Sequence, residues 1–128
     1  MTKQPPVRIL GHGDRGQVVA LELPNGASPA ETFLAELPSR PQAQFKAAIE
    51  RLVQVGWLRS PDVMRILDVD GEPKVSEIKA HYGPGYRLYV VRRHTTWIAT
   101  HGGPKPSNNR RVAAEVNRAR ELLRRWES

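Results

Sequence analysis

Cysteine is absent from the 128 residues of this chain, and so are long apolar runs. Without cysteine there is no disulfide framework and no thiolate metal site, which fits a reducing compartment. No apolar run approaches the ~18 residues that span a bilayer. The polar, proline-rich residues 1–6 lack the apolar stretch of a signal peptide. We therefore expect a soluble, cytoplasmic protein with no membrane partner, flexible over residues 1–6.

Acidic residues are scarce in one segment of the chain. Residues 74–111 hold eight Lys and Arg but a single acid, Glu77, whereas residues 1–73 hold eight basic and nine acidic groups. This segment therefore carries the imbalance behind the net charge of +7. Solubility needs no such segregation by sign, so the pattern predicts a polyanionic partner such as nucleic acid rather than a merely solvated face.

Alternating apolar residues predict two groups of strands. Residues 7–10 and 17–23 flank the glycine-rich residues 11–16, and this pattern is typical of a hairpin. Farther along, three alternating runs are joined by short turns and predict an antiparallel meander. These three runs are Val75 to His81, Tyr86 to Arg92 and Thr95 to His101.

Helical spacing predicts two helices between the strand groups and one after them. The first stops before Pro38 and the second ends at Gly56, while residues 60–70 fit neither helix nor strand clearly. Ser107 is placed to cap the last helix. Residues 1–128 thus predict a single α+β domain, with a twisted, mainly antiparallel sheet packed against two N-terminal helices and one C-terminal helix.

Four pieces of sequence stand out along this order of elements. They are Ser28–Leu34 with Leu37 and Pro38, Glu77–Lys79, Gly85–Tyr89, and His101–Lys105 before a basic helix. Together with the order of hairpin, two helices, meander and closing helix, they resemble the RelE/ParE superfamily of bacterial toxins, with a RelE-like fold. The HigB-like, phage-derived branch is the most similar. Glu77 stands where many RelE proteins carry a second strand lysine.

The resemblance implies the toxin half of a type II toxin–antitoxin system, with a cognate antitoxin protein as partner. It also implies a metal-independent endoribonuclease, an mRNA interferase that cuts mRNA on the ribosome and arrests translation without a cofactor. In that reaction the 2′-hydroxyl of the RNA attacks its own phosphate. The ParE branch instead inhibits DNA gyrase without catalysis. An inactive, basic nucleic-acid-binding module is a third interpretation.

RNA cleavage of this kind needs a base, cations around the phosphate and an acid for the leaving oxygen. Arg87 is the best candidate clamp, because a guanidinium can grip two phosphate oxygens at once. A structural ion pair between Arg87 and Glu77 is nearly as good an interpretation. Lys79 shares a strand face with Glu77, and Lys105 lies in a loop that can close over a phosphate.

His101 and His81 are the candidate acid and base, since imidazole titrates near neutral pH. They end strands that we expect to be neighbours in the meander. Rings for stacking and further arginines make up the predicted RNA-binding set: Tyr82, Tyr86, Arg92, Arg93, Arg110 and Arg111. Each of these residues also has a plainer interpretation as a core or surface residue, and no spacing of His, Asp and Glu suggests a metal.

Overall fold

The computed structural model describes residues 5–68 and 70–128, and most of the segment expected to be flexible, residues 1–6, lies outside them. Pro6 belongs to the fold, because its carbonyl accepts hydrogen bonds from Glu22 N at 3.1 Å and from Trp126 Nε1 at 2.7 Å. The elements are β1 (Val7–Gly13), β2 (Gly16–Leu21), α1 (Pro29–Glu36), α2 (Ser39–Val55), β3 (Met64–Ile66), β4 (Ser76–Ala80), β5 (Tyr86–Arg93), β6 (Thr96–Pro104) and α3 (Asn109–Glu127).

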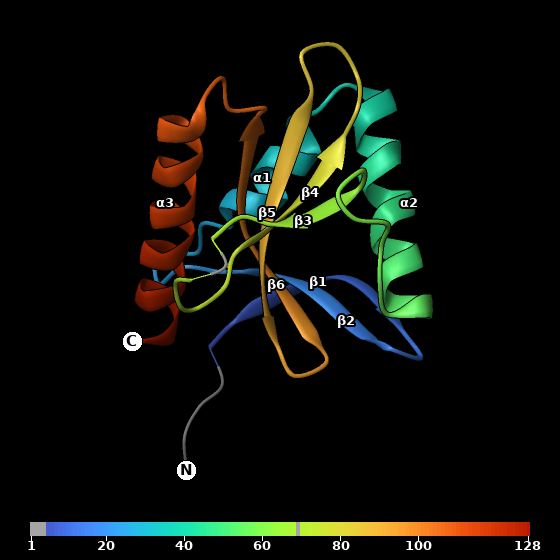
Figure 1. The fold of residues 1–128 in the computed structure, drawn as a ribbon. Helices are drawn as coiled ribbons and strands as arrows, with labels where there is room; N and C mark the ends of the chain where they lie inside the picture. The colour runs from blue at the N-terminus through green and yellow to red at the C-terminus, as the bar shows by residue number, and fades with distance from the viewer. Residues whose placement is uncertain (1–4, 69) are drawn as a thin grey trace.

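Six strands form one mixed sheet in the order β1-β2-β6-β5-β4-β3 (Figure 1). The predicted meander is confirmed: β4, β5 and β6 pair antiparallel, with Glu77 opposite Tyr89 and Tyr89 opposite His101. The predicted hairpin is confirmed as β1 and β2. Among the strands of the described residues, β2 and β6 alone run parallel, with Gln17 opposite Thr96, and this pair joins the hairpin to the meander.

Helices cover both faces of the sheet, α1 and α2 on one and α3 on the other (Figure 1). Strand β5 explains why: Leu88 and Val90 pack in the cluster under α1 and α2, whereas Tyr89 and Val91 pack under α3. A sheet that is apolar on both sides must be covered on both sides. The α+β class is thus confirmed, but the helix arrangement differs from the expectation, because α3 packs apart from the two N-terminal helices.

Two glycines in the first hairpin serve close packing rather than a turn. A Cβ at Gly13 would lie 2.5 Å from the carbonyl oxygen of Val53, and one at Gly11 would lie 2.6 Å from a methyl of Ile49. Strand β1 therefore continues along α2 through residues that the sequence pattern assigned to a loop. The turn itself is confined to Asp14 and Arg15.

The helix caps differ from the prediction in one place. Asn108, rather than Ser107, is the N-cap of α3, and its side chain accepts a hydrogen bond from Arg111 N at 2.9 Å. Gly56 ends α2 in the left-handed conformation with φ of 91°, as predicted. Strand β3, in the region that fitted no pattern, adds an unpredicted edge strand beside β4.

Candidate functional site

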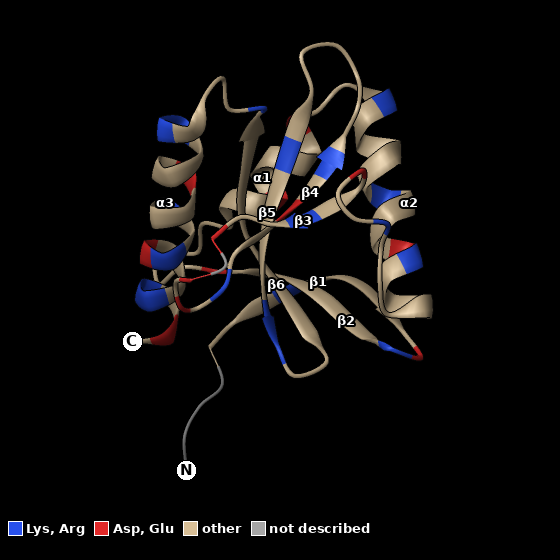
Figure 2. Cartoon of the chain, viewed as in Figure 1, with Lys and Arg blue, Asp and Glu red and all other residues tan. Residues whose placement is uncertain are grey.

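A buried carboxylate links three strands at one end of the sheet. Glu77, on β4, is 2 % exposed, and its Oε1 accepts a hydrogen bond from Arg87 Nε on β5 at 3.0 Å. Its Oε2 lies 2.9 Å from Arg65 Nη2 on β3. Figure 2 shows these basic segments of β3, β4 and β5 side by side, with the acid between them. The two guanidinium groups offset the cost of burying the Glu77 carboxylate.

The register of the sheet brings Lys79 to the same place. Lys79 lies directly opposite Arg87, on the strand face that also carries Glu77. Arg87 is only 5 % exposed, and its Nη1 donates a hydrogen bond to the carbonyl of Tyr86 at 3.0 Å. Arg87 is therefore held from two sides, and the ion pair with Glu77 that the sequence suggested is present.

The pKa of Lys79 is lowered, first by burial of its ammonium group and then by the nearby charges of Arg65 and Arg87, while Glu77 opposes the shift. A shift in this direction favours the neutral amine, which is the form that a general base needs. Lys79 is thus a predicted cation whose pKa is shifted in this direction by its surroundings.

Lys105 approaches Arg87 from the end of β6. Its backbone N–H donates to the carbonyl of Gly85 at 2.9 Å. A Cβ added to Gly85 would lie 3.4 Å from Lys105 Cβ and 3.7 Å from Arg87 Nη1, so the three residues are packed together. Arg111 lines a hollow of about 250 Å³ with Lys105 and Glu115. Cations from three separate segments therefore gather at this end of the sheet, and we call Lys79, Arg87 and Lys105 the basic cluster.

His101 is 3 % exposed and lies under α3. Its Nε2 is 3.0 Å from Glu115 Oε2, its Nδ1 is 3.0 Å from Thr100 Oγ1, and its ring stacks on Tyr89 with centroids 4.7 Å apart. A bulge in β6 between the partners of Tyr89 and Val90 turns His101 to this face. Burial lowers the pKa of His101, with Arg118 adding to the effect and Glu115 opposing it.

Because His101 is buried, the free energy of unfolding depends on the protonation of its imidazole in weak acid. Because the folded-state pKa lies below the ordinary 6.5, the unfolded chain takes up the proton first, and stability is lost as pH falls below about 6.5. We expect the loss of unfolding free energy between pH 7 and pH 5, measured by urea unfolding, to be smaller in His101→Gln than in the wild type. The exposed His12→Gln should keep the wild-type loss. An equal loss in His101→Gln would contradict this assignment.

His81 does not join His101, contrary to the expectation that their strands are neighbours. Strand β5 separates β4 from β6, and His81 follows the end of β4, where its Nε2 lies 2.8 Å from the carbonyl of Asp62. His81 is exposed, and so is the adjacent Tyr82, whose ring lies under the guanidinium of Arg40 at 5.9 Å. His81 is thus the more accessible of the two histidines.

Tyr86 packs on the other face of the sheet from Arg87. Its ring contacts that of Phe33 on α1, with centroids 6.4 Å apart, and it borders the apolar cluster under α1 and α2. This placement fits the plainer interpretation of Tyr86 as a core residue. In the present arrangement its ring does not stand beside the basic cluster.

The predicted RNA-binding arginines fall into two groups. Arg110 and Arg111 begin α3 close to Lys105. Arg92 and Arg93 lie at the opposite end of β5, about 17 Å from Arg87 along a strand that rises about 3.3 Å per residue. There Arg92 Nε donates to the carbonyl of His94 at 2.9 Å, and Arg93 pairs with Glu127 at 2.9 Å.

Sequence reasoning missed two residues of the site, Arg65 and Glu115. Both belong to elements whose position relative to the sheet is not encoded in local patterning. The alternation of Met64, Arg65 and Ile66 on β3 was the one available signal, and three residues are too few to establish it.

No helix in residues 5–68 and 70–128 is long and apolar enough to cross a membrane, and no group of three or more potential metal-ligating side chains occurs there. Comparisons of the chain with protein-family models, curated proteins and solved structures found no match.

Proposed function

We propose that this protein is the toxin of a type II toxin–antitoxin system and cuts mRNA on the ribosome without a metal, as its resemblance to RelE/ParE toxins implies. The order on which the resemblance rests, hairpin, two helices, meander and closing helix, is present, with β3 as an addition. The observation that carries the proposal is the convergence of Lys79 and Lys105 on Arg87, which Glu77 holds in place.

The basic cluster suits attack of a 2′-hydroxyl on the adjacent phosphate. Lys79, with its lowered pKa, takes the hydroxyl proton. Arg87 and Lys105 stabilise the charge that builds on the phosphate oxygens, and Lys105 supplies a proton to the leaving 5′-oxygen. Held by Glu77 and the Tyr86 carbonyl, the Arg87 guanidinium needs little reorganisation when the charge develops.

A second function, binding without catalysis, is favoured by the burial of the other reactive groups. Arg87 is 5 % exposed and His101 is 3 % exposed, so only a small part of either side chain meets solvent. Inhibition of DNA gyrase or simple nucleic-acid binding requires only the surface charge of the basic segment.

Lys79→Met tests the proposal most directly, because Lys79 is partly exposed and the substitution keeps the length of the side chain. We expect a drop of about 100-fold or more in RNA cleavage, the usual cost of removing a general base. Expression of the wild type should arrest growth and create new 5′ ends within coding regions, and Lys79→Met should do neither. Lys46→Met, on the exposed surface of α2, is the matched control and should behave as the wild type.

Other outcomes favour the other functions. DNA breaks with intact transcripts would indicate gyrase as the target. Salt-dependent RNA binding by the purified protein, with no growth arrest and no new 5′ ends, would indicate a binding module.

A further inference from the structure

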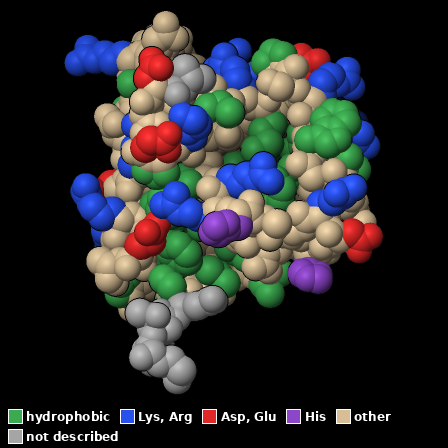
Figure 3. Space-filling model, turned by 60° about the horizontal axis from the view of Figure 1, so that its bottom comes forward, with side chains coloured by type: hydrophobic (Ala, Val, Ile, Leu, Met, Phe, Trp, Pro, Cys, Tyr) green, Lys and Arg blue, Asp and Glu red, His purple; other side chains and the backbone are tan. Residues whose placement is uncertain are grey.

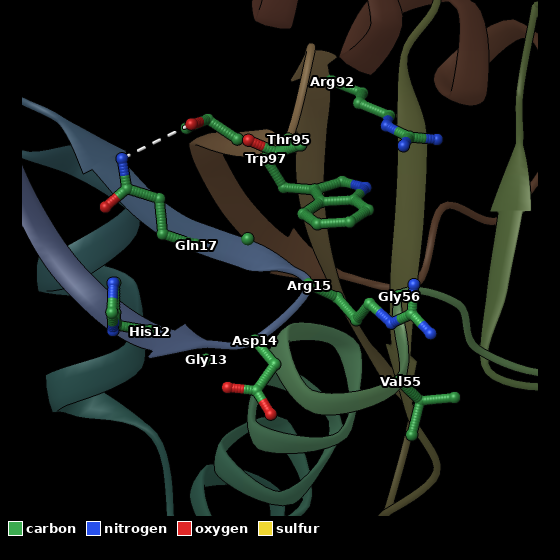
Figure 4. A pocket seen from close by; sticks show the side chains of 12 residues that line it. His12, Gly13, Asp14, Arg15, Gln17, Val55, Gly56, Arg92, Thr95 and Trp97 are labelled. Atoms are coloured by element: carbon green, nitrogen blue, oxygen red, sulfur yellow. Dashed lines mark hydrogen bonds between the residues drawn. The ribbon is translucent and has the colours of Figure 1, made fainter.

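Two hollows open at the end of β5 opposite the basic cluster. One, of about 700 Å³, lies between the tip of the β1–β2 hairpin, the end of α2 and β6 (Figure 4). The other, of about 630 Å³, lies between the segment after α2, β3 and the β5–β6 turn. Both hollows are lined by Gly56, Arg92 and Trp97, so they are neighbours that share one wall. We call the two together the hairpin-end groove.

The groove concentrates exposed apolar side chains. Val55, Trp57 and Ile66 line it and are 37 %, 57 % and 49 % exposed. Leu58 and Met64 add aliphatic surface beside them. Figure 3 shows hydrophobic side chains in a hollow of this face of the molecule, with basic side chains around it. Contiguous exposed apolar surface with a polar rim is typical of a protein interaction site.

The rim of the groove is basic. Arg92 lies over the ring of Trp97, 5.0 Å from its centroid, and Arg15 stands at the hairpin tip; Figure 4 shows the Trp97 indole between these two side chains. Among the described residues neither arginine forms an ion pair with a carboxylate. Two carboxylates line the groove: Asp14, next to Arg15 at the hairpin tip, and Glu72, which is paired with Lys74 at 3.0 Å. Arg15 and Arg92 are therefore available to pair with the carboxylates of an acidic partner.

The groove is built from fixed backbone. Arg15 N donates to the carbonyl of Val53 at 2.8 Å, and Gln17 N donates to that of Thr95 at 3.1 Å. These bonds tie the hairpin tip to α2 on one side and to the β5–β6 turn on the other. A preformed groove of this kind binds a peptide without first having to order its own walls.

We propose that the hairpin-end groove binds an acidic, amphipathic peptide segment of a partner protein. Leucine or aromatic side chains of the peptide enter between Trp57 and Ile66, and its carboxylates pair with Arg15 and Arg92. This proposal does not rest on RNA cleavage, because the groove arginine Arg92 lies about 17 Å from Arg87 along β5. On its β3 side the groove extends to Arg65, the exposed partner of Glu77.

Peptide fits the groove better than RNA does. Bases stack on aromatic rings and phosphates pair with cations, so Trp57 and the arginines alone would suit either ligand. The aliphatic walls formed by Val55, Leu58, Met64 and Ile66 offer a base nothing to stack on, whereas they match the apolar face of an amphipathic helix.

The test starts from random peptides displayed on phage and selected on the intact protein. We expect the selected peptides to be rich in Asp and Glu, with Leu, Phe or Trp at helical spacing. A synthetic copy of the most enriched peptide, labelled with a fluorophore, should bind roughly tenfold or more weakly to Trp57→Ser and to Arg15→Glu. Both residues are exposed, so these variants should fold.

Tyr82→Ser, an exposed aromatic at the other end of the sheet, and Lys79→Met should bind the peptide as the wild type does. Loss of RNA cleavage in Lys79→Met with intact peptide binding would separate the two proposals. The peptide site is overturned if the selected peptides lack acidic residues, or if Trp57→Ser and Arg15→Glu bind them normally. It is also overturned if these two variants lose affinity for a single-stranded RNA oligonucleotide but not for the peptide.

Discussion

Replacing Glu77 with alanine should lower the free energy of unfolding by about 3–5 kcal/mol, which is the usual cost of removing one partner from a buried ion pair. The Glu77 carboxylate is 2 % exposed and accepts hydrogen bonds from Arg65 and Arg87. Without this carboxylate, the positive charge of Arg87, which is 5 % exposed, is left buried without its ion-pair partner. Equilibrium unfolding in urea measures the loss.

Arg65→Ala is the control for this prediction. It breaks the other ion pair of Glu77, but Arg65 is itself 48 % exposed, so we expect a loss of about 1 kcal/mol or less. The double variant Glu77→Leu/Arg87→Met, which removes both charges and fills their space, should be far more stable than Glu77→Ala. If Glu77→Ala lowers the free energy of unfolding by less than about 1 kcal/mol, Arg87 must reach solvent freely, and the Glu77–Arg87 ion pair contributes little to stability.

Arg87→Lys should reduce RNA cleavage by about 100-fold or more, because an ammonium cannot grip two phosphate oxygens as a guanidinium does. Lysine keeps the positive charge beside Glu77, so we expect the melting temperature to fall by only a few degrees. Arg87→Ala should also abolish cleavage and growth arrest, but it leaves Glu77 with Arg65 alone and costs more stability. Cleavage of a model RNA and thermal unfolding are measured on the same preparations.

The comparison between the two substitutions distinguishes a phosphate clamp from a purely structural arginine. A structural Arg87 predicts that stability and activity fall together, and that the folded Arg87→Lys protein still arrests growth. That outcome would remove Arg87 from the site. Lys105→Ala should reduce cleavage less than Arg87→Lys, because the Lys105 side chain has no bonded partner in the described residues comparable to Glu77.

Local patterning was enough for most of the elements. Alternation of apolar residues on β5 predicted both the strand and its burial, since Leu88 and Tyr89 pack on opposite faces. The pairing of Glu77 with Arg87 followed from their positions in two adjacent strands. What local patterning could not supply was the face on which α3 packs, because an amphipathic helix specifies its own apolar side but not its partner.

Features that depend on distant contacts also escaped prediction. The bulge in β6 turns His101 under α3, and without it His101 would share a face with Ala99. Gly11 and Gly13 suggested a loop, whereas each is required by the close passage of α2. Such glycines and bulges can be distinguished from turns only when the neighbouring element is known.

The parallel pairing of β2 with β6 has a consequence for biosynthesis. Gln17 on β2 and Thr96 on β6 are 79 positions apart in the sequence. Strand β6 is the last strand to be translated. During translation the edge of β2 that pairs with β6 therefore stays without its strand partner until β6 has left the ribosome. Loop-closure entropy makes such a long-range contact slow to form. The parallel strand pair of the finished sheet is thus among the last that the growing chain can complete.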